Sequence, residues 1–202
     1  MTKFSIKEAI MFGWETTKKN LWFYVGLIFI FGIINYVPDA VLDQLPQDFS
    51  PFIFFILFIL IWAVQLTTQV GLTYITLRVT EKKKPMMQDL FLHYRLAIAF
   101  FIASAGFWLI VVSGTLLLII PGIILAIRLS LFGYEVAEGT SHFQALKNSW
   151  KITRGSTIHL FLFGLSLAGL NIIGALALGV GLFLTIPTSI LASAYVYKKL
   201  RG

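Results

Sequence analysis

The chain carries six long apolar runs, and this feature limits its fold more than any other. A helix needs about 20 apolar residues to cross the roughly 30 Å hydrocarbon core of a bilayer. Charged residues make up only 12% of the chain and hydrophobic residues 58%, which leaves too little polar surface for a soluble enzyme domain. We therefore predict an all-α protein, a polytopic transmembrane bundle of six helices, over Leu21–Val37, Pro51–Leu77, Leu96–Ile120, Ile123–Val136, Ile158–Leu176 and Gly181–Tyr197.

The start of the fourth helix has two solutions, and the sequence does not choose between them. A turn at Pro121-Gly122 leaves the fourth helix short, and proline disfavours a helical conformation in the residue before it. A turn nearer Ser113-Gly114-Thr115 gives the fourth helix a normal length, with Pro121 inside it. The second run is long enough to tilt or to project beyond the hydrocarbon core.

Basic residues fall on one side of the predicted hairpins. Fifteen of the sixteen Lys and Arg residues lie before the first run, after the second, after the fourth or after the sixth. The opposite side carries Asp39, Asp43 and Asp48 and no Lys or Arg. Because basic loops stay in the cytoplasm, we expect a multi-pass protein of the cell (inner) membrane with both termini cytoplasmic.

Many of these basic residues are candidates for contact with the membrane surface. Each Lys or Arg near a bilayer surface attracts anionic lipids with about 1 kcal/mol. Short clusters that flank membrane runs do not favour nucleic-acid binding, so the expected partners are the lipid bilayer, with its anionic lipids, and another membrane protein. The predicted surface contacts are Lys18, Lys19, Lys82, Lys83, Lys84, Lys147, Lys151 and Arg154.

An amphipathic segment followed by two apolar runs occurs three times. Ser5 and Glu8 have the spacing of a capping box, in which an N-cap hydroxyl and a carboxylate three residues on satisfy the first amides of a helix. Ser141 and Gln144 repeat that spacing, and a weaker third copy spans Gln88–Arg95. A shift of 136 positions aligns further residues of the first and last copies: Ala9 with Ala145, Trp14 with Trp150, and Thr17 with Thr153.

Three such units predict a single integral membrane domain over residues 1–202, built by internal repetition. The units cover approximately residues 1–78, 81–136 and 140–199, each an interfacial amphipathic helix followed by a transmembrane hairpin. All three begin on the same side of the membrane. We therefore expect parallel repeats about an axis along the membrane normal, not inverted repeats.

Three segments carry a resemblance to a known group of proteins. They are Gly13-Trp14 ahead of Lys18-Lys19-Asn20, the run from Pro121 to Ser130, and the segment from Ala145 to Thr153. They resemble a group of poorly characterised bacterial six-helix membrane proteins that includes the membrane domain of glycerophosphoryl diester phosphodiesterases. The resemblance implies a helical integral membrane protein. Because the chain ends soon after the sixth run, we expect no soluble domain and no phosphodiesterase activity.

Arg128 is the one basic residue inside an apolar run, and it is the first candidate for a functional site. A charged side chain at membrane depth is costly unless it is paired, hydrated or near the interface. Glu135 follows about two helical turns later, so the two side chains would share a polar cavity for an anionic solute or a lipid headgroup. Gln65, Gln69 and Asn171 complete this predicted polar intramembrane site.

Two structural alternatives for Arg128 stay open. Its guanidinium would pair with carbonyl groups or side-chain oxygens of a neighbouring helix and fix the packing. Alternatively, the fourth helix starts at Ile123, which leaves Arg128 shallow enough to reach the interface by snorkelling.

Catalytic and cofactor chemistry has no support in the sequence. The chain has no cysteine, which excludes disulfides, iron–sulfur clusters and thiolate zinc sites. Its three histidines have no metal-site spacing, and no phosphate-binding loop or nucleophile motif occurs. We expect no catalytic residue, no metal and no cofactor, and a non-enzymatic membrane scaffold, lipid-interacting or partner-binding module. The alternative is a small transporter or permeation module for an anionic solute or lipid headgroup.

Overall fold

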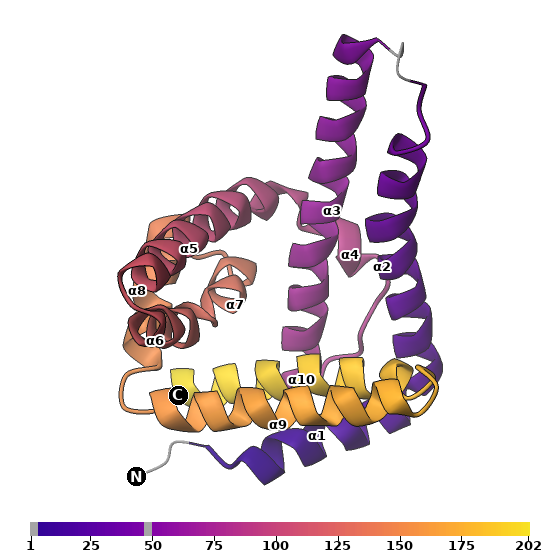
Figure 1. The fold of residues 1–202 in the computed structure, drawn as a ribbon. Helices are drawn as coiled ribbons and strands as arrows, with labels where there is room; N and C mark the ends of the chain where they lie inside the picture. The colour runs from indigo at the N-terminus through magenta and orange to yellow at the C-terminus, as the bar shows by residue number, and fades with distance from the viewer. Residues whose placement is uncertain (1–3, 47–49) are drawn as a thin grey trace.

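The structure, a computed structural model, describes residues 4–46 and 50–202 of the chain (Figure 1). Lys3 and Asp48, which belong to the predicted charge pattern, lie outside these ranges. Within them every regular element is a helix, so the prediction of an all-α protein is confirmed.

Three helices form the N-terminal third of the chain. α1 (Ile6–Lys19) starts where the sequence predicts, because the Ser5 hydroxyl accepts the Glu8 amide N–H at 3.4 Å. α2 (Leu21–Leu42) continues past its predicted end. α3 (Pro51–Thr80) has 30 residues, about 45 Å at 1.5 Å per residue, so it is longer than the core of a bilayer.

The middle of the chain departs from the prediction in two places. The expected third amphipathic helix is only α4 (Asp89–Leu92) followed by a 3₁₀ turn, η1 (Tyr94–Leu96). α5 (Ala97–Leu117) and α6 (Ile119–Leu129) are joined by Leu118 alone, whose backbone is extended. The turn between the third and fourth runs therefore falls between the two positions that the sequence offered.

Pro121 explains why α6 starts just before it. The proline lies in the first turn of α6, where amide groups have no partner within the helix, so its missing N–H costs no hydrogen bond. After α6 the chain breaks at Ser130 and Leu131 and resumes as α7 (Phe132–Ala137).

The last third of the chain holds α8 (His142–Ile152), α9 (Thr157–Leu176) and α10 (Leu182–Arg201). Ser141 takes the N-cap position of α8 with an extended backbone, but its hydroxyl makes no capping bond. The second predicted capping box is therefore wrong in this detail.

Five helical stretches of the described residues are long and apolar enough to cross a membrane. α10, the sixth predicted span, is not among them, because polar side chains such as Thr188 lower its hydropathy; Thr188 is buried against protein. These five stretches indicate a multi-pass membrane protein; they are Leu21–Leu42, Pro51–Thr80, Tyr94–Leu117, Ile119–Ala137 and Thr157–Leu176.

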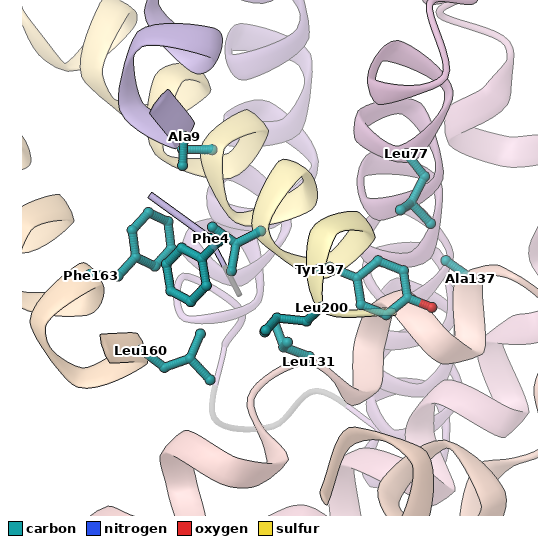
Figure 2. Close-up of a cluster of buried hydrophobic side chains, with 11 residues drawn as sticks. Phe4, Ala9, Leu77, Leu131, Ala137, Leu160, Phe163, Tyr197 and Leu200 are labelled. Atoms are coloured by element: carbon teal, nitrogen blue, oxygen red, sulfur yellow. The ribbon is translucent and has the colours of Figure 1, made fainter. Parts of the chain in front are cut away.

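The main hydrophobic core lies where α1, α3, α7, α9 and α10 meet. Figure 2 shows side chains from all of these helices or their ends gathered there: Phe4, Ala9, Leu77, Leu131, Ala137, Leu160, Phe163, Tyr197 and Leu200. The helix pairs diverge from this region, since α2 and α3 extend away from it while α9 and α10 run across their direction (Figure 1). Large apolar side chains such as Phe52 and Leu116 are consequently exposed, as expected of surface that lipid covers.

Candidate functional site: a buried carboxylate junction

Glu135 is the most deeply buried charged side chain among the described residues, at 1% exposure. Its Oε1 accepts the Tyr197 hydroxyl at 2.9 Å. Its Oε2 accepts the Asn148 side-chain amide at 2.8 Å and the Thr140 hydroxyl at 3.3 Å. Because a buried carboxylate is costly without such donors, these three groups define a built polar site.

The end of α7 explains why Thr140 lies beside Glu135. Gly139 has φ +88°, a conformation that glycine adopts without strain. The Gly139 amide donates to the Val136 carbonyl at 2.8 Å and the Thr140 amide to the Glu135 carbonyl at 3.0 Å. This pair of bonds is the Schellman motif, and it turns the chain directly into α8, which carries Asn148.

Two more glutamates lie at the ends of helices beside Glu135. Glu81 is the C-cap of α3 and Glu138 is the C-cap of α7. A carboxylate is unfavourable next to the negative end of a helix dipole, so each needs a cation. Lys198 of α10 supplies one to both, with its Nζ 2.7 Å from Glu81 and 2.5 Å from Glu138.

Arg201 and Lys83 complete the charge balance. Arg201 pairs with Glu138, and its Nε lies 3.8 Å from Glu135 Oε1. Lys83 Nζ lies 2.7 Å from Glu81. The hydrogen bond from Lys198, followed by that from Lys83, lowers the pKa of Glu81 from its ordinary 4.5 to about 2.

We call this set the carboxylate junction: Glu81, Glu135 and Glu138 with Lys83, Lys198, Arg201 and Tyr197. Its three carboxylates face three cations, and it joins the ends of α3, α7 and α10. In Figure 2 the Tyr197 hydroxyl points toward Ala137, at the end of the helix that carries Glu135. These ion pairs and hydrogen bonds hold together segments that are far apart in the sequence, and we call this set of contacts the clasp.

Arg128 does not belong to the carboxylate junction. Its guanidinium stacks on the Trp150 ring, with Cζ 3.4 Å from the ring centre, and its Nη2 donates to the Trp150 carbonyl at 3.1 Å. Ser149 and Thr153 hydroxyls both donate to the Arg128 carbonyl at 3.0 Å. Arg128 is thus held on α8 through a backbone carbonyl, which is one of the two structural alternatives that the sequence leaves open.

The break after α6 separates Arg128 from Glu135. The sequence predicts both residues on one helix face, but α6 ends at Leu129 and α7 begins at Phe132. The two side chains consequently have different neighbours, Trp150 for Arg128 and Tyr197 for Glu135.

The other predicted polar residues are also dispersed. Gln65 on α3 donates to the Asn35 carbonyl of α2 at 3.4 Å and to the Asp39 carboxylate at 3.5 Å. Gln69 is exposed. Asn171 on α9 donates to the Ser189 hydroxyl of α10 at 3.0 Å. Each bond links neighbouring helices, and together these residues form no single polar site.

All eight predicted surface basic residues are exposed. Lys18 lies over the Trp14 ring, with Nζ 4.8 Å from its centre. Lys83 differs from the others because it forms an ion pair with Glu81 within the protein. Phe143 and Trp150 are exposed among the basic residues of α8, and this amphipathic pattern is typical of the membrane interface. The exposed basic residues are Lys18, Lys19, Lys82, Lys83, Lys84, Lys147, Lys151 and Arg154.

Sequence reasoning missed most of the carboxylate junction. It identified Glu135 as a candidate site residue. It did not identify the other members of the carboxylate junction, among them Glu81, Glu138, Tyr197 and Lys198. One signal was present: Glu138 immediately precedes Gly139 at the end of an apolar run, the position of a helix C-cap.

The cavities between the described helices are lined mainly by apolar side chains. One of about 210 Å³ lies between α2, α3 and α10, and one of about 280 Å³ lies between α6 and α9. None of those described includes Arg128 or Glu135 in its lining. Within residues 4–46 and 50–202, no three His, Asp or Glu side chains are placed to hold a metal ion.

Comparison of the chain with protein-family models, with curated proteins and with solved structures finds no match. The resemblance to the bacterial six-helix group therefore stays a prediction.

Proposed function

We propose that this chain is a non-catalytic scaffold of the inner membrane, which presents a basic cytoplasmic face to anionic lipids or to another membrane protein. The observation that carries this proposal is the internal pairing of the carboxylate junction. Glu135 receives all of its hydrogen bonds from Tyr197, Asn148 and Thr140, so its polar atoms serve cohesion between helices.

Three parallel repeats are the architecture we propose for this scaffold. In each proposed unit, the segment before the hairpin packs on the second membrane helix of another unit. α1 packs on α10, α4 packs on α3, and α8 packs on the junction of α6 and α7. The contacts are thus cyclic, as expected of units arranged around one axis.

Matching positions make these contacts in the first and third units. Gly13 of α1 lies so close to α10 that a Cβ there would be 3.2 Å from the Ala192 amide nitrogen. Ser149, which is 136 positions later, accepts the Leu131 amide N–H at 3.2 Å. Ala9, Ala145, Thr17 and Thr153 are fully buried on the same two faces. This equivalence supports the predicted repetition.

We propose that both termini of the chain lie on the cytoplasmic side of the membrane. Lys198, near the C-terminus, contacts Glu81 after α3 and Glu138 after α7. Three of the segments that the charge pattern assigns to one side therefore lie together, and the positive-inside rule makes that side cytoplasmic.

Reconstitution into liposomes tests the scaffold proposal against the transporter alternative. We expect neither uptake of anionic solutes nor lipid scrambling above protein-free liposomes, for the unaltered chain and for Arg128→Ala alike. Flux that the unaltered chain supports and Arg128→Ala abolishes would overturn the proposal and favour a permeation module.

A further inference from the structure

Two arginines beside one apolar groove have no acidic partner. Arg128 lies one residue before the end of α6 and Arg154 lies just before α9. The Thr153 hydroxyl, next to Arg154, donates to the Arg128 carbonyl at 3.0 Å and so joins the two segments. Within residues 4–46 and 50–202, neither has a carboxylate within 4.0 Å. Exposed lysines such as Lys147 and Lys151 also lack a carboxylate partner, but the Arg128 guanidinium differs from them because it is fixed in place beside the end of an apolar groove.

The Arg128 guanidinium is held in a fixed orientation. Stacking on Trp150 and the bond from Nη2 to its carbonyl position the group. Nε is shielded from solvent, so among the described contacts Nη1 is the nitrogen left to bind an anion. A planar guanidinium with spare donors matches the oxygens of a phosphate. Arg154 is exposed, so its guanidinium is accessible to an anion in solution or at the membrane surface.

Neither arginine lines the groove between α6 and α9, but the groove reaches Ile127, the residue before Arg128, and Thr157, three residues after Arg154. Ile127, which precedes Arg128, lines it together with Ile123 and Ile120 further along α6. Ile158 and Phe161 of α9 form the facing wall, and the cavity measures about 280 Å³. A positive end next to an apolar channel has the chemistry that a phospholipid requires.

The first turn of α9 adds to the attraction for an anion. No side chain caps this 20-residue helix at Ser156, so its first amide groups lack side-chain acceptors, and helix N-termini favour anions. Thr157 of that turn lines the groove.

We propose that Arg128, Arg154 and the first turn of α9 bind the phosphate of one anionic phospholipid, whose acyl chain lies in the groove between α6 and α9. This inference rests on the proposed membrane location and names one lipid class that the scaffold binds. Two positive charges favour a headgroup with net negative charge over a zwitterionic one.

Native mass spectrometry of the purified full chain in detergent, titrated with phosphatidylglycerol, tests the site. We expect one tightly held phosphatidylglycerol and at least about tenfold weaker binding of phosphatidylcholine. Arg128→Gln with Arg154→Gln is expected to weaken phosphatidylglycerol binding by at least about tenfold. Lys147→Gln with Lys151→Gln removes the same charge from the exposed face of α8 and is the matched control, with at most about twofold loss.

Two further arms separate the lipid site from simpler explanations. Ile124→Trp fills the groove and leaves both arginines in place, so we expect it to release the lipid. Excess inorganic phosphate is expected to displace phosphatidylglycerol only weakly, because it makes the headgroup contacts but lacks the acyl chain that fills the groove. Arg154→Gln alone changes an exposed residue and keeps the test valid if the double variant does not fold; we expect it to weaken binding measurably.

Equal losses in the arginine and lysine variants would overturn the proposal, because they would indicate diffuse surface attraction. Unchanged binding in Arg154→Gln and in Ile124→Trp would overturn it as well. Failure of this lipid site leaves the membrane topology and the flux result untouched, so the two proposals fail separately.

Discussion

The Tyr197 hydroxyl donates to Glu135 Oε1 at 2.9 Å, across 62 positions of the sequence. Tyr197 is fully buried near the C-terminal end of α10, and its ring stacks on Tyr134 of α7 with centres 5.1 Å apart. The same hydroxyl lies 3.0 Å from Glu138 Oε2. One side chain therefore joins the last helix to the centre of the carboxylate junction.

Tyr197→Phe is expected to destabilise the protein by about 1–3 kcal/mol, because Glu135 stays buried and loses one donor. The ring stacking on Tyr134 is retained, so the effect isolates the hydroxyl. Reversible unfolding in mixed micelles measures it. Tyr195→Phe is the matched control, since among the described contacts its hydroxyl makes no hydrogen bond, and we expect little change; equal stability of both variants would contradict the clasp.

Gly13→Ala is expected to loosen α1 from α10. A Cβ at this position would lie 2.3 Å from the Thr188 carbonyl oxygen, so the helices must move apart, at a cost of about 1–3 kcal/mol. Gly169→Ala on α9 is the control, because nothing lies within 4 Å of its Cβ position. Unfolding and proteolysis within α1 report the difference, and an unchanged Gly13 variant would show that α1 is not packed this closely.

Acid is expected to weaken the protein partly through Glu81. Its pKa is depressed in the folded state, from 4.5 to about 2. The ion pairs to Lys198 and Lys83 therefore contribute stability above pH 4.5, and this contribution is lost as the pH falls from 4.5 toward 2. Glu81 is partly exposed, so solvent screening keeps the effect small.

The measurement is the unfolding temperature in detergent over that pH range, for the unaltered chain and for Glu81→Gln. We expect the gap between the two to be widest at neutral pH and to close in acid. A gap that is constant with pH would show that the Glu81 charge does not contribute.

The long helices could be predicted from the sequence, and their pairing could not. Runs of apolar residues fix where a helix crosses a bilayer, because backbone groups there must bond within their own segment. Leu118 as a one-residue turn carries no such signal, since the apolar run continues through it. The break at Ser130 also has no signal in the sequence, since no proline or glycine marks it. Because of this break, Arg128 and Glu135 lie on different helices and contact different residues.

The carboxylate junction shows the same limit. Glu135 was recognised because a carboxylate in an apolar run is unusual. Its hydrogen-bond partners come from α8, α10 and the turn before α8, and whether they meet depends on how the helices pack. The low hydropathy of α10 comes from its polar residues, which the fold accommodates by burying them against other helices.

Labelling of single cysteines from either side of the membrane tests the account most directly, and the chain contains no native cysteine to interfere. We predict that Lys84→Cys, Lys147→Cys and Lys199→Cys react with an impermeant maleimide only from the cytoplasmic side. Gln44→Cys, in the segment between α2 and α3, should react only from the opposite side. Reaction of Lys84→Cys and Lys199→Cys from opposite sides would contradict the three-hairpin topology and the clasp between Glu81 and Lys198.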